Sequence, residues 1–439
     1  MISKSTQSTS WSVDNGCTGF TAPHRYCRGA VAPSSVSGHR GARQPGGGVI
    51  VLVALVAVTM SGCSVSRHPT ASRTVQVLGE PKGPTLVMGQ PAPAGTGDLG
   101  AVSCAKKGRC WAVGIAGPDT TPPPGGATVI AATINGGVTW KAQHVSGETI
   151  PELSGISCPT ATECMAVGSN GSSLPAGVVV TTSDAGAVWN PATAPAGALS
   201  VASVSCASPA DCLAIVSDGS TLWSAQSTDF GQTWQRFGNL PGSFLGGGDL
   251  WCGVGGACLV AGHVPTTSGH GQGAVALSAD GGQTWALATV PSVSGLLQSA
   301  ACPSASTCLA GGTKSTTTSD IVPAQGELLH SVDGGHTWTD VTDAPPVDDV
   351  SDMECPTATV CAMVGTHWAG NPPVATGAVA QSADGGATFK ASSAAYIPIS
   401  LRAVACPTPA HCVAVGGDTV ARITLVAPQP RHSHASAHP

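Results

Sequence analysis

Two patterns decide the fold, Cys252-Gly-Val-Gly-Gly-Ala-Cys258 and Ser278-Ala-Asp-Gly-Gly-Gln-Thr-Trp285, because both recur along the chain. Fourteen of the 17 cysteines form seven Cys-x5-Cys pairs, and the first cysteines of consecutive pairs lie 46 to 54 residues apart. Apolar stretches flank the pairs, which predicts disulfides that close β-hairpins, with a turn between the two cysteines. Metal binding is the alternative, but structural zinc sites want four close ligands, commonly spaced Cys-x2-4-Cys, so we predict no metal site. The predicted disulfides join Cys104 to Cys110, Cys158 to Cys164, Cys206 to Cys212, Cys252 to Cys258, Cys302 to Cys308, Cys355 to Cys361 and Cys406 to Cys412.

The second pattern is a turn that reads Ser-x-Asp-x-Gly-x-Thr-Trp in its strongest copies. In such a turn the Asp and Ser side chains bond the backbone, Gly supplies positive φ, and Trp packs across the strands. The pattern resembles the Asp-box, or bacterial neuraminidase repeat, of sialidase-like β-propellers, where this motif lies away from the active site. We therefore expect a structural role for the residue at the Asp position. Six copies occur, with Asn135, Asp184, Asp229, Asp280, Asp333 and Asp384 at that position.

One repeat reads strand, disulfide turn, strand, variable loop, strand, Asp-box turn, strand, which is a four-stranded propeller blade. The chain is therefore predicted to be an all-β, seven-bladed β-propeller. The seventh repeat stops after residues 420–426, so an N-terminal strand, from 85–89 or from 74–78, is expected to close the ring. Such a closure removes exposed sheet edges. Over residues 73–427 the pattern resembles the seven-bladed propeller of the photosystem II assembly factor family, and it is similar to many bacterial secreted proteins.

The composition of the 439 residues excludes some classes of protein. Lys and Arg number 18 against 24 Asp and Glu, without a basic cluster, so no nucleic-acid partner is expected. No apolar run reaches the about 18–20 residues of a membrane-spanning helix. Seventeen cysteines in a chain with only 10% charged residues indicate an oxidising compartment.

The N-terminal region is predicted to be an export signal. Residues 49–60 are an apolar run of 12 residues that suits a signal-peptide h-region, and Arg40 and Arg43 precede it. Met60-Ser-Gly-Cys63 resembles the lipobox of bacterial lipoproteins, which implies that Cys63 becomes the lipidated first residue of the mature chain. Secretion with an unmodified Cys63 is the alternative. We expect the protein at the bacterial cell surface or the outer face of the cytoplasmic membrane, anchored by lipid.

The remaining boundaries follow from composition. Residues 1–48 are interpreted as a leader from a start codon assigned too far upstream, or as disordered, and 49–63 as h-region and lipobox. Residues 64–97 are predicted to be a flexible tether that includes the ring-closing strand within about 73–90, and 98–427 the propeller. The tail 428–439 contains three histidines and is predicted to be disordered, with weak metal binding as the alternative.

The repeat order also sorts the loops. The disulfide turn and the Asp-box turn are expected on one face of the disc, and the loops between second and third strands, with the links between blades, on the other. Variable loops on a rigid scaffold are a usual place for binding. The candidate residues there are His263, His270, Lys314, His367 and Trp368. The link 340–354 carries six carboxylates, and we interpret it as a solvated acidic loop, with Ca²⁺ binding as the alternative.

Three functions are compatible with this architecture. Sialidases use an arginine triad, a Tyr nucleophile with a Glu partner, and an Asp acid/base, and the propeller holds only four arginines and one tyrosine, Tyr396. We therefore predict a monomeric, non-catalytic binding or assembly scaffold, without cofactor, whose partner is an envelope protein or a glycan. A sialidase-like or other glycan-active glycoside hydrolase is the alternative. A structural envelope component without a specific ligand is the third possibility.

Overall fold

The computed structural model describes residues 83–427, apart from 89–90, 94–95, 107, 117–127, 147–151, 172–173, 247, 254, 267–270, 292–294, 315–324, 342–344, 371–372, 393–396 and 398. These residues belong to one compact unit, Gly79–Pro439. The predicted leader, lipobox and tail lie outside the described residues, as do most of the tether, His270 and Tyr396. The described part contains strands and no helix, and therefore no helix that could cross a membrane.

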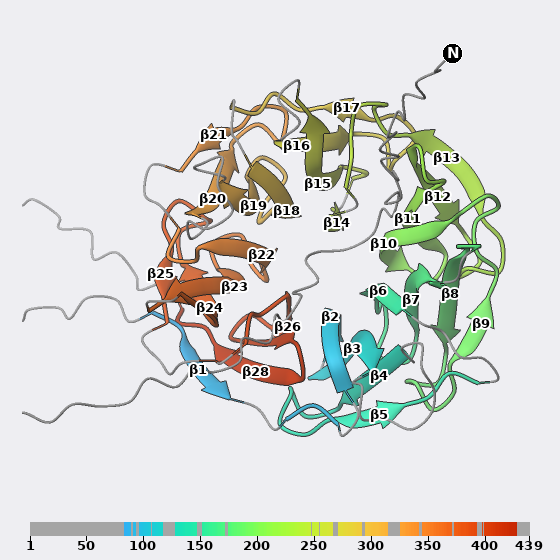
Figure 1. Cartoon of the computed structure of the whole chain (residues 1–439), viewed down its shortest axis with the longest axis horizontal. Coiled ribbons are helices and arrows are strands. Elements are labelled where there is room, and N and C mark those ends of the chain that lie inside the picture. Colours follow the sequence, from blue (N-terminus) through green and yellow to red (C-terminus); the bar gives the residue numbers. More distant parts are fainter. Residues whose placement is uncertain are drawn as a thin grey trace, which may run out of the picture. The chain divides into compact units, whose positions relative to one another are not determined.

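Within this part, 28 strands form seven antiparallel sheets of four, arranged as blades around an axis (Figure 1). The predicted all-β, seven-bladed fold is confirmed. Blades 1 and 2 consist of β2 Thr96–Ala105, β3 Arg109–Ala116, β4 Thr128–Thr133, β5 Lys141–Gln143, and β6 Glu152–Ser157, β7 Cys164–Ser169, β8 Gly177–Thr182, β9 Asn190–Ala192. Blade 3 consists of β10 Ser200–Ser208, β11 Asp211–Ser217, β12 Leu222–Ser227 and β13 Gln235–Asn239.

The outer strands of the next three blades are only two residues long. Blade 4 consists of β14 Leu250–Cys252, β15 Cys258–Pro265, β16 Gly271–Ser278 and β17 Ala286–Leu287. Blade 5 consists of β18 Gly295–Ala301, β19 Cys308–Lys314, β20 Gln325–Ser331 and β21 Thr339–Asp340. Blade 6 consists of β22 Asp349–Glu354, β23 Cys361–Ala369, β24 Val374–Ser382 and β25 Lys390–Ala391.

The ring closes in blade 7 with a strand from the N-terminal side. Blade 7 consists of β26 Ala403–Thr408, β27 His411–Gly416, β28 Thr419–Thr424 and β1 Thr85–Met88. Strand β1 pairs antiparallel with β28, from Thr85 opposite Thr424 to Met88 opposite Ala421. Of the two candidate closing segments, it is therefore the one at 85–88 that forms the outer strand.

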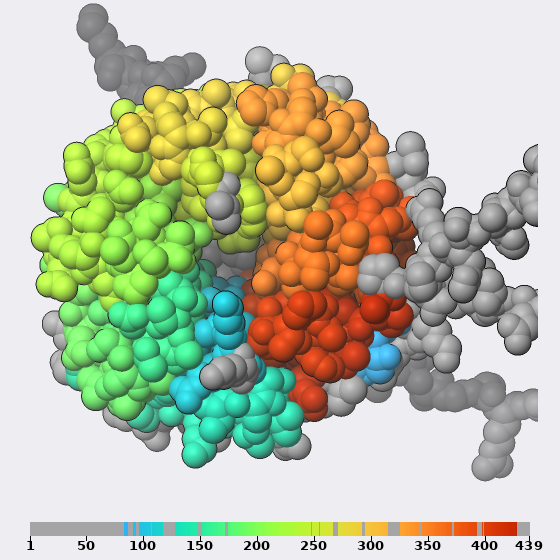
Figure 2. Space-filling model, turned by 180° about the vertical axis from the view of Figure 1, so that it is seen from behind, coloured from blue at the N-terminus to red at the C-terminus, as the bar shows by residue number. Residues whose placement is uncertain are grey.

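The first strands of the blades stand innermost, and each contacts the first strands of both neighbouring blades. Figure 2 shows the blades following one another around a central hollow. Side chains of these strands bind the backbone of the next blade. The Ser103 hydroxyl accepts a hydrogen bond of 3.1 Å from the Cys158 N–H, and the Ser157 hydroxyl accepts one of 3.0 Å from the Cys206 N–H. The inner ring is therefore tied together between blades as well as within them.

The hydrophobic core lies in the spaces between neighbouring blades. In the space between blades 1 and 2, for example, Trp111 and Ile130 belong to the same buried cluster as Val180 and Trp189. A glycine recurs in the second strand of the blades, shortly before the variable loop, and lets the first strand approach the second closely. At Gly312 a Cβ atom would collide with the carbonyl oxygen of Leu296 on β18.

All seven predicted disulfides are present. Because each closes a short loop, chain-entropy arithmetic gives about 2 kcal/mol of stabilisation per bond. Seven such bonds support a core that consists mostly of small aliphatic side chains, Ala and Val above all. The bonds join Cys104 to Cys110, Cys158 to Cys164, Cys206 to Cys212, Cys252 to Cys258, Cys302 to Cys308, Cys355 to Cys361 and Cys406 to Cys412.

The turn between the cysteines is shorter in blades 1, 3 and 7 than in the other blades. There the strand pairing continues past the disulfide, so the turn is shorter than the five residues between the cysteines. The outermost pairs are Ala105 opposite Arg109, Ser208 opposite Asp211 and Thr408 opposite His411. Cys110, Cys212 and Cys412 therefore lie within β3, β11 and β27.

The second cysteine of each disulfide also belongs to the hydrophobic core. Cys110 and Cys212 are fully buried and Cys412 is 2% exposed, and each lies in a cluster between two blades. The corresponding cysteines of the other four blades are 0–2% exposed. Each of these sulfur atoms therefore packs the core in addition to closing its hairpin.

Candidate functional site

The two kinds of turn lie on one face of the propeller, which we call the turn face. We keep the name disulfide turn for the five residues between paired cysteines, and we call the six turns around Asn135, Asp184, Asp229, Asp280, Asp333 and Asp384 the aspartate turns. In five blades an N–H of the aspartate turn donates a hydrogen bond of 2.7–2.9 Å to a carbonyl of the disulfide turn, as Gly281 does to Gly256. The ends of the second and third strands away from these turns, which carry the loops between them, lie on the opposite face, and we call it the variable face.

The aspartate turns use their polar groups internally, as the turn of blade 5 illustrates. The Thr337 N–H and hydroxyl donate to the two oxygens of Asp333 at 2.9 and 2.6 Å, and the Ser331 hydroxyl donates to the same carboxylate at 2.8 Å. These donors hold the pKa of Asp333 well below its usual range. Equivalent donors lower the pKa of Asp280 to about 2. A carboxylate fixed in this way serves the turn rather than acid–base chemistry.

The structure distributes the predicted binding residues over three blades of the variable face. His263 lies on β15 of blade 4, half-buried, and burial lowers the pKa of its imidazole. Lys314 ends β19 of blade 5, and His367 and Trp368 are neighbours on β23 of blade 6. Only the last two share an interaction network, and His270 lies outside the described residues.

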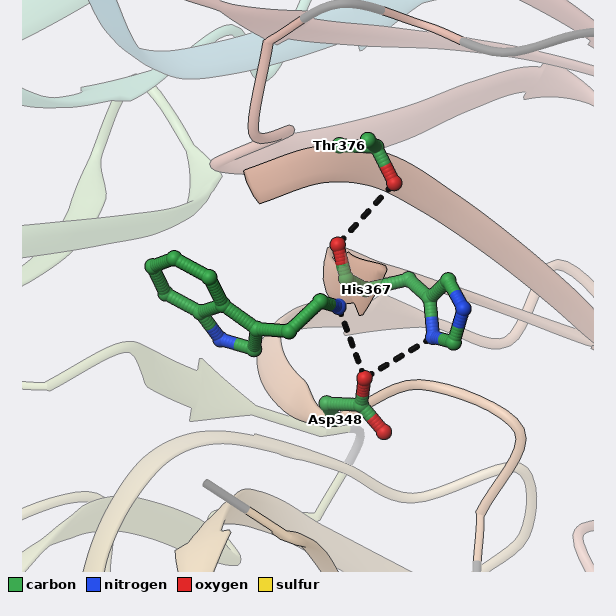
Figure 3. A network of polar contacts seen from close by, with 4 residues as sticks. Asp348, His367 and Thr376 are labelled. Carbon is green, nitrogen blue, oxygen red and sulfur yellow. Dashed lines mark hydrogen bonds and ion pairs between the residues drawn. The ribbon is translucent and has the colours of Figure 1, made fainter. Parts of the chain in front are cut away.

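That network centres on Asp348, in the link between β21 and β22 (Figure 3). One oxygen of its carboxylate, Oδ2, lies 2.8 Å from His367 Nδ1 and accepts the backbone N–H of Trp368, also at 2.8 Å. The Thr376 hydroxyl donates to the His367 carbonyl at 2.9 Å. The His367 side chain is 53% exposed, and its Nε2 lies on the side of the ring away from Asp348 in Figure 3. An oriented imidazole is thereby presented to solvent.

The hairpin that carries this network is long because β23 and β24 have nine residues each. Their pairing continues through His367 opposite Thr376 to Ala369 opposite Val374. Val374, at the start of β24, is 50% exposed. Blade 6 thus presents an imidazole, an indole and an aliphatic side chain on a paired, ordered hairpin.

The acidic link 340–354 differs from the solvated loop that we expected. Asp349 accepts hydrogen bonds from the Gln298 amide at 2.6 Å and from the Thr313 hydroxyl at 2.5 Å. Asp352 accepts from Ser299 in blade 5 and from the Val404 N–H in blade 7, at 3.0 and 2.7 Å. Glu354 accepts the Cys406 N–H at 2.6 Å.

These carboxylates therefore join blades 5, 6 and 7. Of the other two described acids of the link, Asp348 belongs to the network of Figure 3 and Asp340 is exposed on β21. Asp343 lies outside the described residues. No group of three or more His, Cys, Asp or Glu suited to a metal ion occurs among the residues that the structure describes.

Sequence reasoning missed Glu327, a buried carboxyl on β20 of blade 5. The residue is 2% exposed, and both carboxyl oxygens lack a hydrogen-bond partner. Burial raises the pKa of Glu327 to about 7, an effect that Lys314 opposes. A comparison of the repeats could have revealed it. Glu327 lies opposite the glycine that precedes the variable loop, and the equivalent residue is Val129 in blade 1 and Val178 in blade 2.

Asp249 and Asp352 form an acidic pair that the sequence does not suggest. Both stand three residues before the first cysteine of their blades, 4 and 6, on the inner ring. Burial and the proximity of the Asp249 carboxylate raise the pKa of Asp352, and burial raises the pKa of Asp249 to about 6. The residues lie 103 positions apart in the chain, so only the closed ring brings them together.

The four propeller arginines do not converge on a common point in the described structure. Arg109 opens β3 beside the disulfide of blade 1, and Arg236 stacks on Trp223 in blade 3, 4.5 Å from the ring centroid. In blade 7, Arg402 pairs with Asp98 at 2.8 Å and the Arg422 side chain lies beside Gly137 of blade 1. The residues that a sialidase-like site needs for a substrate carboxylate are thus held apart here.

Comparison with known proteins identifies the fold. No protein-family model matches the chain, and no curated protein matches it. Among solved structures, YCF48 bound to D1 peptide is similar with a TM-score of 0.53 and 14% identity, over 78% of this chain and 97% of that one. YCF48 from Cyanidioschyzon merolae gives a TM-score of 0.51 and 13% identity, over 77% and 99%. A streptogramin B lyase gives a TM-score of 0.54 and 9% identity, over 78% and 98%. At these identities the similarity shows a shared propeller fold.

Proposed function

We propose that this protein is an exported, lipid-anchored binding or assembly scaffold that holds a protein or peptide partner on its variable face. We also assign the aspartate turns to the Asp-box repeat and the lipid anchor to Cys63. The observation that carries the proposal is the division between the two faces. One face is occupied by turns whose polar groups bond to one another, whereas the other carries the network of Asp348, His367 and Trp368, in which the His367 side chain is exposed.

The direction of the chain in blade 7 supports this use of the variable face. Thr85 pairs with Thr424, and β28 runs from the variable face to the turn face, so β1 begins at the turn face. The described chain therefore enters blade 7 at the turn face. If Cys63 carries the lipid, the chain that leads to it departs from β1 at the turn face and not at the variable face.

The similarity to a propeller solved with a peptide is in keeping with a peptide or protein partner. YCF48 was determined bound to D1 peptide, and it shares the propeller fold with this chain. Blade 6 offers a tryptophan, a residue type that recurrently anchors such partners, on a paired hairpin that also carries an exposed imidazole.

Affinity capture tests the proposal. The full chain, as exported, is immobilised and incubated with envelope extract, and the double variant His367→Ala/Trp368→Ala is compared with the wild type. Two exposed turn-face residues, His336 and Val332, provide the control variant His336→Ala/Val332→Ser. We expect a defined set of proteins that the wild type and control retain and the blade 6 variant loses. Equal capture by all three proteins would contradict a site on this hairpin.

An activity assay addresses the alternative function. The purified protein is incubated with fluorogenic sialosides and with glucans, and product is measured over time. We expect no turnover above that of a boiled sample. Turnover that depends on a carboxyl residue of this chain would overturn the scaffold proposal in favour of a glycoside hydrolase.

A further inference from the structure

Blade 1 differs from the other blades in the charge of its turns. Its disulfide turn reads Ala105-Lys-Lys-Gly-Arg109, and the disulfide turns of the other six blades contain no Lys or Arg. Its aspartate turn carries Asn135, where the other five carry an aspartate. The turn face of blade 1 is therefore the part of that face in which both turns lack an acidic residue.

Further cations lie beside these two turns. Lys141 opens β5 directly after the aspartate turn, and the side chain of Arg422 in blade 7 lies against Gly137 of that turn. Lys106 and Lys141 are exposed, and Arg109 and Arg422 are half-exposed. The structure shows no ion pair between any of these four and a carboxylate of the described residues. The predicted absence of a basic cluster is thus corrected locally, because the fold gathers cations from separate stretches of the chain.

Exposed aliphatic side chains accompany these cations. Ile134 is 72% exposed and Val138 40% exposed, both in the aspartate turn of blade 1. Val188, in the adjacent turn of blade 2, is 43% exposed. Blades 1 and 2 are joined here, since the Gln143 amide donates to the Ala185 carbonyl at 3.2 Å. We call Lys106, Arg109, Ile134, Val138, Lys141, Val188 and Arg422 together the basic–aliphatic patch.

We propose that the basic–aliphatic patch docks the turn face onto a lipid bilayer that carries anionic headgroups. Unpaired Lys and Arg side chains are attracted to such a surface, and exposed aliphatic groups enter its headgroup boundary. A soluble polyanion would satisfy the cations but would leave the aliphatic groups in water. The patch lies in blades 1, 2 and 7, and blade 7 contains β1, where the chain enters from the turn face. The inference deepens the proposed anchored scaffold, because docking would present the variable face away from the membrane.

The test removes the lipid anchor, so that only membrane binding through the protein surface is measured. The full chain with Cys63→Ser is mixed with vesicles of about 30% phosphatidylglycerol in phosphatidylcholine, or of phosphatidylcholine alone, and binding is measured by cosedimentation. We expect binding to the anionic vesicles that weakens with salt. Each Lys close to an anionic surface strengthens binding about fivefold, so Lys106→Ala/Lys141→Ala should lose on the order of 20-fold.

Two matched controls come from the repeats. Lys390 opens β25 of blade 6 as Lys141 opens β5, but it follows the aspartate turn of Asp384. Lys141→Ala should weaken binding about fivefold, whereas Lys390→Ala should change it less than about twofold. Val332 of blade 5 is 71% exposed at the position that Ile134 occupies in blade 1. Ile134→Ser should weaken binding several-fold, and Val332→Ser should leave it unchanged.

Several outcomes would overturn the proposal. It fails if anionic vesicles do not bind the Cys63→Ser chain, or if Lys390→Ala and Lys141→Ala weaken binding equally. It also fails if soluble polyphosphate displaces the vesicles completely and Ile134→Ser has no effect, because the patch would then be a polyanion site. Melting temperatures equal to the wild type exclude misfolding as the cause of a loss. None of these results affects partner capture by blade 6, so the two proposals can fail separately.

Discussion

The buried Glu327 makes the stability of the propeller depend on pH, and Glu327→Gln tests this dependence. Burial raises the pKa of this carboxyl from its ordinary value of 4.5 to about 7, and neither oxygen has a hydrogen-bond partner. The folded protein therefore holds a proton between these pH values that the unfolded chain releases. As pH rises from 4.5 through 7, the free energy of unfolding falls, and above pH 7 the loss is complete.

The size of this loss of stability follows from the difference between the pKa of Glu327 in the unfolded chain and its pKa in the folded protein. At 1.36 kcal/mol per pH unit, the gap corresponds to about 3 kcal/mol at pH 8 and to almost nothing at pH 4. Glutamine has nearly the same shape and cannot ionise. The variant Glu327→Gln should therefore be more stable than the wild type by about 2–3 kcal/mol at pH 8 and equal to it within about 0.5 kcal/mol at pH 4.

The assay is urea unfolding of both proteins at pH 4, 6 and 8, with the disulfides intact. Glu152→Gln, which removes a half-buried carboxyl at the start of β6, controls for the loss of a charge elsewhere in the ring. The reasoning would be refuted if Glu327→Gln changed stability by the same amount at pH 4 and pH 8. A loss of stability at pH 8 would refute it as well.

Three further predictions concern the scaffold. Cys158→Ala/Cys164→Ala should reduce the free energy of unfolding by at least about 2 kcal/mol in a urea titration, and a loss under about 0.5 kcal/mol would contradict the chain-entropy account. Gly312→Ala places a Cβ against the Leu296 carbonyl and should lower the melting temperature clearly, whereas Gly100→Ala, with open space around its Cβ, should not. The half-exposed ion pair of Arg402 and Asp98 ties blade 7 to blade 1, and Arg402→Ala should cost less than about 1 kcal/mol at low salt, an effect that 1 M NaCl should remove.

The fold was predictable because each repeat carries its own turn chemistry. The Cys-x5-Cys pairs and the aspartate turns mark where strands reverse, so the strand order within a blade follows from the chain itself. The prediction left two candidates for the closing strand, and the structure shows that the segment containing Thr85 fills this place. Local sequence could not separate them, because the choice depends on which segment reaches the edge of β28.

The exact length of each disulfide turn was not predictable from the cysteine spacing. All seven pairs have the same spacing, yet β3, β11 and β27 begin one residue before Cys110, Cys212 and Cys412, whereas the other four second strands begin at the cysteine. The burial of these cysteines depends on the neighbouring blade, which the spacing does not describe.

The roles of individual acids were less predictable, because they depend on neighbours from other blades. Asp352 reads as part of an acidic loop, yet its carboxylate accepts hydrogen bonds from Ser299 and Val404, about 50 residues away on either side. Glu327 was detectable in principle, since the equivalent position in blades 1 and 2 is valine. The basic–aliphatic patch likewise needed the fold, which brings Arg422 next to the turn of blade 1.

The central claim is that the partner binds the variable face and not the turn face, and site-specific photo-crosslinking in intact envelopes tests it most directly. A photo-reactive residue is placed at Val374 on the variable face or at Val332 on the turn face, positions that are 50% and 71% exposed. The account predicts discrete adducts with a protein from position 374 and none from position 332. Adducts from position 332 alone, or the same adducts from both positions, would contradict it.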